Sequence, residues 1–137
     1  MCMLDYYEHE SFASPTTMVQ EYAKVSGQTP DPDLYEDLIS EEYDEWVFET
    51  SLISGEVRKH YGGSYNAVNE LKELADLVYV IYGYANAKGW DLEEAVKRVH
   101  ENNMGRMYQP DGSILRREDG KILKNKDFPK VDLSDLV

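Results

Sequence analysis

Apolar residues recur through most of the chain at the three- and four-residue steps typical of α-helices. A first helix is predicted over about residues 16–25, before Gly27 and Pro30, and a second over about residues 33–59 with Asp33 as its N-cap. The apolar stripe of the second helix consists of Leu34, Leu38, Ile39, Trp46, Leu52 and Ile53.

The third predicted helix covers about residues 65–88, with Ser64 as its N-cap and Gly89 just past its end. Between residues 74 and 84 it is apolar nearly all round, and Asp76 is its one charge there. A helix of this kind lies at the centre of a bundle or in a subunit interface. Because three further helices are too few to cover it within one subunit, we expect a homodimer or a homotetramer.

The pattern changes after the fourth predicted helix, which runs from an Asp91 cap to about Asn103. Residues 113–116 and 121–124 then predict a β-hairpin that turns at Asp119-Gly120. The chain from Phe128 onward is expected to be an extended tail.

These elements predict an all-α bundle with a C-terminal β-hairpin and an extended tail, and a length of 137 residues suits one folded domain. We expect an N-terminal arm over residues 1–13, a helical catalytic domain over 14–104, and a basic hairpin with the tail over 105–137.

Charge is distributed unevenly along the chain. The formal net charge is −13, and residues 1–57 hold 14 acids against a single base, Lys24. An acidic surface repels nucleic acid polymers, so no polymer partner is expected.

Cellular location is suggested by what the sequence lacks. It has no run of about 20 apolar residues, its N-terminus is acidic, and Cys2 is its single cysteine. We therefore expect no membrane contact, no signal peptide and no intramolecular disulfide, which favours the cytoplasm, or the host cytoplasm if the source is a virus.

Two acidic clusters fall where helical periodicity would place apolar residues. In the second helix, one stripe at steps of 4, 3, 4 and 3 consists of Leu38, Glu42, Glu45, Glu49 and Leu52. In the third helix, a stripe at steps of 3, 4 and 3 consists of Glu73, Asp76, Val80 and Gly83. Two helices that bring such faces together either bury negative charge or hold divalent cations between them.

Each acid also has an ordinary interpretation as a solvated charge. Glu41 and Glu45 stand four residues apart, as exposed acids often do, and Glu73 could pair with Lys72 or Lys59. Two carboxylate pairs in core phase on consecutive helices nevertheless favour a metal site over chance.

The ligand chemistry favours magnesium. All candidate ligands are hard oxygen donors, which suit Mg²⁺, with Mn²⁺ as a substitute, better than zinc or copper. A di-iron bundle needs Glu-x-x-His, and His9, His60 and His100 do not stand three residues after a glutamate. Mg²⁺ between two helices would bridge the phosphates of a polyphosphate ligand and activate a water molecule.

The spacing Glu41-Glu42-x-x-Glu45 followed by Glu73-x-x-Asp76 resembles the signature of the all-α nucleoside triphosphate pyrophosphohydrolases. That superfamily includes the MazG proteins, the dimeric dUTPases and the phosphoribosyl-ATP pyrophosphohydrolases. The resemblance implies a MazG-like helical bundle completed by oligomerisation.

Further segments look like the phosphoribosyl-ATP pyrophosphohydrolase-like branch of the MazG relatives. They are residues 76–83, 99–104 and 117–124, so the resemblance covers roughly residues 33–137. It implies cleavage of a nucleoside triphosphate between its α and β phosphates, giving a monophosphate and pyrophosphate, in nucleotide-pool cleansing or recycling.

The resemblance also assigns roles to residues of this chain. Those implied to bind magnesium are Glu41, Glu42, Glu45, Glu73 and Asp76, with Glu41 on a further ion or supporting the others. Glu42 and Glu45 are the implied catalytic residues, and Glu42 is expected to orient and deprotonate the attacking water.

The side chains implied to bind the substrate are Tyr79, Asn103, Arg106, Arg117, Lys121 and Lys124. The bases among them would neutralise phosphate charge, and the Tyr79 ring could stack on a base. Their ordinary alternatives are a solvated hairpin face for the bases and core packing for Tyr79.

Three functions are therefore weighed. The leading expectation is hydrolysis of a standard, deoxyuridine or modified nucleoside triphosphate, and the alternative substrate is phosphoribosyl-ATP. A non-catalytic acidic binding module is the alternative from another class, but it leaves Asp76 in an apolar setting without an explanation.

Overall fold

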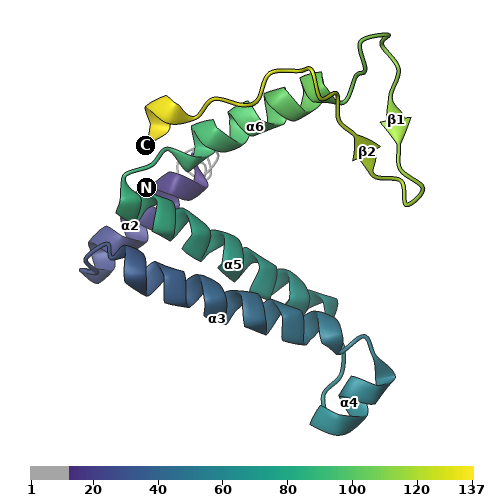
Figure 1. The fold of residues 1–137 in the computed structure, drawn as a ribbon. Coiled ribbons are helices and arrows are strands. Elements are labelled where there is room, and N and C mark those ends of the chain that lie inside the picture. Colours follow the sequence, from purple (N-terminus) through teal and green to yellow (C-terminus); the bar gives the residue numbers. More distant parts are fainter. Residues whose placement is uncertain (1–12) are drawn as a thin grey trace, which may run out of the picture. The chain divides into compact units, whose positions relative to one another are not determined.

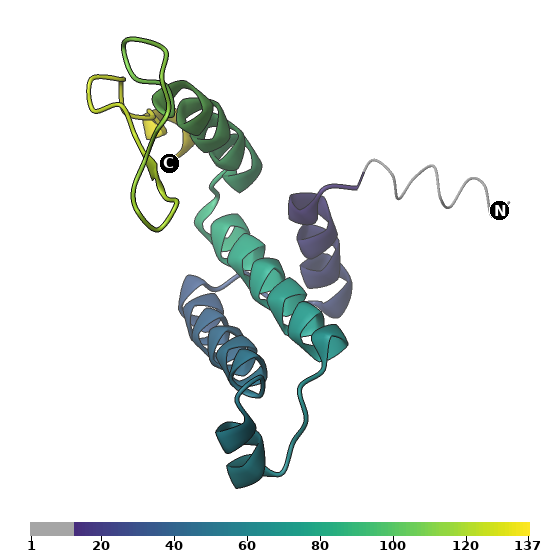
Figure 2. The ribbon, with the colours of Figure 1, turned by 90° about the vertical axis from the view of Figure 1, so that its right-hand side faces the viewer.

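The computed structural model describes residues 13–137, which form two compact units, one ending at Gly89 and the other beginning at Trp90. The helices of the first unit are α2 (Pro15–Ser26), α3 (Pro32–Ser51), α4 (Gly55–Tyr61) and α5 (Ala67–Lys88). Helix α5 lies between α2 and α3, and α3 runs antiparallel to it (Figures 1 and 2).

The first predicted helix and the first part of the second are confirmed, and both helices begin slightly earlier than expected. Ser14 caps α2, its side chain accepting a hydrogen bond from the Thr17 N–H. Asp31, and not Asp33, caps α3 by accepting from the Asp33 N–H at 3.0 Å. The shift follows from Pro32, which occupies the first helical position. A proline fits there because the N–H that it lacks would have no intrahelical partner at this position.

The expectation that the second helix continues to about residue 59 is wrong. Helix α3 ends at Ser51, and a turn separates it from α4. The Ser51 hydroxyl donates to the Phe48 carbonyl at 2.6 Å, and Arg58 Nη1 donates to the carbonyls of Leu52 and Ile53 at 2.9 and 3.0 Å. Arg58 thus donates hydrogen bonds to carbonyl groups that have no intrahelical partner after the end of α3.

Helix α5 begins later than predicted, with Asn66 rather than Ser64 as its N-cap, and it ends as predicted at Gly89. Gly89 adopts a left-handed conformation (φ 73°) in which its N–H donates to the carbonyls of Ala85 and Asn86. The buried apolar side chains of the described chain are Val19, Tyr35, Leu52, Val80 and Ala85.

Much of the apolar surface of α5 remains uncovered within the chain. Leu74, Val78, Tyr79 and Ile81 are between 36% and 44% exposed, although the sequence places them in its most apolar segment. A helix that is apolar nearly all round is therefore covered here on its α2 and α3 sides only.

The second unit consists of α6 (Leu92–Arg106), strands β1 (Leu115–Arg116) and β2 (Ile122–Leu123), and the 3₁₀ helix η1 (Ser134–Leu136). Asp91 caps α6 as predicted, and the antiparallel hairpin pairs Leu115 with Leu123. Figure 1 shows the hairpin as two short arrows.

The chain after Phe128 returns along α6. The Asn102 amide donates to the Pro129 carbonyl at 2.8 Å, and the Arg98 guanidinium binds the Asp135 carboxylate, with Nη2 2.9 Å from Oδ2. The segment contains η1, which the expectation of a wholly extended tail did not include.

The predicted N-terminal arm lies almost wholly outside the described residues, and the predicted division at residue 104 stays a prediction. Among residues 13–137, no helix is both long and apolar enough to cross a membrane.

Candidate functional site

The antiparallel packing of α3 on α5 places the two acidic clusters opposite each other. Glu42 and Glu45 stand on α3, one turn apart, and Glu73 and Asp76 stand one turn apart on α5. The predicted common face brings Glu42, Glu73 and Asp76 together, whereas Glu45 is exposed and is not one of the converging carboxylates, so its predicted metal role stays a prediction.

Three carboxylates converge there. Glu42, Glu73 and Asp76 each offer one oxygen, and these oxygens lie within 4.8 Å of one another. All three residues are half-buried. A divalent cation coordinated by carboxylates needs such a set of convergent oxygen atoms.

Negative charge is crowded in this cluster. Burial raises the pKa of Glu42, and the neighbouring charges of Glu45, Asp76 and Glu73 raise it further. Burial also raises the pKa of Glu73, with a second contribution from Glu45, while Lys72 opposes the shift. Like charges held together in this way favour protonation or a bound cation.

Two oxygen atoms of the cluster lack hydrogen-bond partners. Oε2 of Glu42 and Oε2 of Glu73 are buried, and neither makes a hydrogen bond in the structure as described. An unpaired buried acceptor costs about 1–3 kcal/mol, and more when it is charged. A bound divalent cation would satisfy these atoms, so the residues present fit a hard metal ion.

Lys72 balances part of the negative charge. Its ammonium lies 2.7 Å from Asp76 Oδ2 and 3.5 Å from Glu73 Oε1, while its side chain is 64% exposed. The pairing with Lys72 that the sequence left open for Glu73 is therefore present. An exposed lysine leaves such a site readily, because an exposed ion pair contributes little stability.

The remaining acids of α3 differ in their positions. Glu41 is exposed, as expected for a residue about 100° around the helix from Glu42, and its predicted metal role stays a prediction. Glu49, which the sequence placed on the acidic stripe but not in the site, is half-buried and has a buried Oε2 without a partner.

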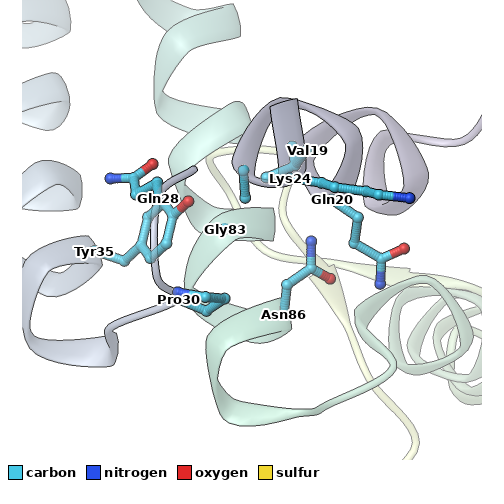
Figure 3. Close-up of a pocket in the computed structure, with 9 residues that line it drawn as sticks. Val19, Gln20, Lys24, Gln28, Pro30, Tyr35, Gly83 and Asn86 are labelled. Atoms are coloured by element: carbon cyan, nitrogen blue, oxygen red, sulfur yellow. The ribbon is translucent and has the colours of Figure 1, made fainter. Parts of the chain in front are cut away.

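A cavity with both apolar and polar lining residues lies two helical turns along the same pair of helices. It has a volume of about 330 Å³ and lies among α2, α3 and α5 (Figure 3). Its polar lining consists of Gln20, Lys24, Gln28, Tyr35 and Asn86. The sequence analysis assigned none of these residues to a site, because they are spread over residues 20–86 and form no local motif.

Tyr79 lies elsewhere on α5. Its ring packs edge-on against Tyr22 of α2 at a centroid distance of 5.9 Å, and the residue is 38% exposed. Packing on Tyr22 agrees with the ordinary interpretation of this ring, and its proposed stacking on a base stays a prediction.

The other predicted substrate-binding residues belong to the second unit. Those that line a cavity of about 810 Å³ beside the hairpin are Arg106, Arg117, Lys121 and Lys124. Lys124 Nζ donates to Asn103 Oδ1 at 3.2 Å, whereas the Arg117 guanidinium is bound to Asp119. Arg106 has a buried Nε that makes no hydrogen bond within the described chain.

Comparison with known proteins gives one family. No curated protein sequence matches the chain. The family model described as phosphoribosyl-ATP pyrophosphohydrolase matches residues 9–103, more than half of the chain, and the match includes both acidic clusters. The chain therefore belongs to the phosphoribosyl-ATP pyrophosphohydrolase family, within the MazG-like all-α nucleotide pyrophosphohydrolases.

Proposed function

We propose that this protein is a magnesium-dependent pyrophosphohydrolase that cleaves a nucleotide polyphosphate between its α and β phosphates. The family supports a pyrophosphohydrolase. The observation that carries the metal dependence is the convergence of Glu42, Glu73 and Asp76 within 4.8 Å, with two buried oxygens lacking partners.

The metal ligands in this proposal are Glu42, Glu45, Glu73 and Asp76. Mg²⁺, or Mn²⁺ in its place, would neutralise phosphate charge and lower the pKa of a water molecule. Lys72 pairs with Asp76 and Glu73, and a cation bound to these acids would displace it.

We assign the proton transfer to Glu42. Each residue of the cluster offers one oxygen to an ion, so the second oxygen of Glu42 is left to accept a proton from an attacking water. Burial raises the pKa of Glu42, and the charge of Glu45 adds to the shift, which makes Glu42 a stronger base in the absence of an ion.

The cavity beside the hairpin is proposed to bind phosphate oxygens. Arg106, Lys121 and Lys124 line it, and the Nε–H of Arg106 is a buried donor without a partner within the described chain. Guanidinium and ammonium groups form charge-assisted hydrogen bonds with phosphate.

Two substrates suit this reaction. A nucleoside triphosphate would place the protein in pool cleansing or recycling, and phosphoribosyl-ATP is supported equally by the family that matches. Growth of a histidine-requiring strain that lacks its own phosphoribosyl-ATP hydrolase separates them: rescue by this gene supports phosphoribosyl-ATP, and failure of a well-expressed protein excludes it.

Turnover tests the proposal directly. Wild-type protein, Glu42→Gln and the matched control Glu36→Gln, an exposed glutamate of the same helix, are compared on a nucleotide panel with and without Mg²⁺. We expect Mg²⁺-dependent hydrolysis, a loss of about 10²–10⁴-fold in Glu42→Gln, and little change in the control. Absence of turnover for every nucleotide, phosphoribosyl-ATP included, would favour a non-catalytic binding module.

A further inference from the structure

Lys72 of α5 places its charge directly on the acidic cluster. The residue precedes Asp76 by four positions and therefore stands one turn away from it on the same helix. Its ammonium nitrogen lies 2.7 Å from Oδ2 of Asp76 and 3.5 Å from Oε1 of Glu73. Lys72 thus contacts two of the three converging carboxylates, the third being Glu42, and an ion shared by these acids would compete with it.

This lysine can leave the acids and still remain beside them. Its side chain is 64% exposed, and an exposed ion pair contributes little to stability. A lysine carries a compact charge on a flexible four-carbon stem, and the base of the Lys72 stem is fixed by helix α5. A cation that displaces the ammonium therefore leaves it tethered next to the cluster, where it can donate to another oxygen atom.

The first unit offers few other positive charges to a phosphate. Lys24 is the single base of residues 1–57, and it lines the cavity among α2, α3 and α5. Arg58 donates to the carbonyls of Leu52 and Ile53. Among the described residues of this unit, Lys72 is the one whose ion pairs reach the converging carboxylates.

The charge of the cluster favours a cation in this position. Three carboxylates carry three negative charges, and one divalent ion cancels two of them. The negative charge that remains would repel a phosphate chain, and the ammonium of Lys72 cancels it. Mg²⁺ is bound through one or two carboxylates together with phosphate oxygens of the substrate. These phosphate oxygens would therefore arrive beside the acids that Lys72 contacts.

We propose that Lys72 exchanges one partner for another when substrate binds. It pairs with Asp76 and Glu73 in the absence of an ion, and it donates a hydrogen bond to a phosphate oxygen once an ion and a polyphosphate occupy the cluster. Ammonium groups form charge-assisted hydrogen bonds with phosphate. The inference rests on the proposed function and adds to it a substrate-binding residue, for which the sequence indicated only a pairing with Glu73.

Three variants and a probe without a base test the exchange. Lys72→Met removes the charge and keeps an apolar stem, Lys72→Arg keeps a charge, and Lys59→Met is the matched control at an exposed lysine of α4. Because both lysines are exposed, all three variants should fold like the wild type. The probe is imidodiphosphate, whose P–N–P bridge resists hydrolysis. Isothermal titration measures its Kd at saturating Mn²⁺ and, separately, the Kd of Mn²⁺ alone.

The exchange predicts opposite changes in the two affinities. Lys72→Met should raise the Kd of imidodiphosphate by about tenfold, because a hydrogen bond to a charged group is lost. It should lower the Kd of Mn²⁺ alone by about two- to fivefold, because a competing cation is lost. Lys72→Arg should restore most of the affinity for imidodiphosphate, and Lys59→Met should behave as the wild type.

Other patterns would overturn the inference. A lysine that only shapes the site would make Lys72→Met weaker toward both ligands, and a lysine that only competes with the ion would make it weaker toward neither. The inference would also fail if metal-loaded wild-type protein did not bind imidodiphosphate, or if Lys59→Met weakened this binding as much as Lys72→Met.

Turnover separates this inference from the proposed function. Imidodiphosphate binding that depends on Lys72, in a protein that hydrolyses no nucleotide, would uphold the role of the lysine and refute the proposed reaction. Mg²⁺-dependent turnover with a KM that Lys72→Met leaves unchanged would uphold the reaction and overturn the inference.

Discussion

Gly83 of α5 lies directly against the ring of Tyr35 of α3. A Cβ atom built at position 83 would clash with Cε1 and would lie 2.6 Å from Cδ1 of that ring. Both residues are buried, so the ring has little room to move away. This contact fixes the distance between the two helices that carry the acidic cluster.

Gly83→Ala is therefore expected to destabilise the protein. Overpacking of this kind typically costs about 1–3 kcal/mol, which exceeds the gain of up to about 1 kcal/mol from replacing a helical glycine. Thermal unfolding should show a Tm lower by a few degrees. The control is Gly63→Ala, where a Cβ would lie an ordinary 3.5 Å from Leu52 Cδ2. An unchanged Tm for Gly83→Ala would contradict the close packing.

Lys72 is expected to compete with a divalent cation. Because its ammonium lies 2.7 Å from Asp76 Oδ2, its removal leaves the acids more available to an ion. Lys72→Met should lower the Kd for Mn²⁺ by about two- to fivefold at low salt, and less as salt rises. Isothermal titration measures this against Lys59→Met, an exposed lysine on α4. Weaker Mn²⁺ binding in Lys72→Met would show that the lysine organises the site instead of competing.

The metal-free protein is expected to become more stable on mild acidification. Burial raises the folded pKa of Glu42 above its unfolded value, and Glu45 adds to the shift. A raised pKa contributes stability that is fully present below the unfolded pKa and is lost as pH rises through the folded pKa. In EDTA, the Tm should therefore rise as pH falls from neutrality toward the ordinary range of carboxyl groups.

The same experiment on variants isolates Glu42. The gain should be smaller in Glu42→Gln and unchanged in Glu36→Gln, which removes the same charge from an exposed position on α3. Excess Mg²⁺ should abolish the gain, because the cation favours the deprotonated carboxylates. Equal pH profiles for the wild type and Glu42→Gln would count against a strained acidic cluster.

The exposed apolar face of α5 predicts self-association. Leu74, Val78 and Ile81 are 36–44% exposed on a helix that the chain covers only with α2 and α3. Light scattering should give a homodimer or a homotetramer, and Val78→Glu should shift it toward a monomer. Val96→Glu on α6 is the control, since Val96 is exposed outside this face. A wild-type protein that stays monomeric at high concentration would refute the interface.

Much of the fold could be predicted because local chemistry marks it. The Asp91 cap, the Gly89 terminator and the hairpin around Gly120 each depend on a few neighbouring residues, and the structure confirms them. The break between α3 and α4 was missed because the apolar stripe continues through Leu52, while the Arg58 side chain that closes the break acts six residues away.

The site was predictable in part for the same reason. Carboxylates at helical spacing indicate a shared helix face, and the structure brings Glu42, Glu73 and Asp76 together. The cavity was not predicted from the sequence. The hydrogen bond from Asn86 to the Thr16 carbonyl of α2 joins residues 70 positions apart, and no local sequence pattern indicates such a contact.

The central claim is that the acidic cluster drives cleavage between the α and β phosphates. ³¹P nuclear magnetic resonance of a reaction run in ¹⁸O-water with Mg²⁺ tests it most directly. The account predicts pyrophosphate and a nucleoside monophosphate that carries the isotope on its phosphate group, formed about 10²–10⁴-fold more slowly by Glu42→Gln. Release of inorganic phosphate with a diphosphate, or equal turnover by Glu42→Gln, would contradict it.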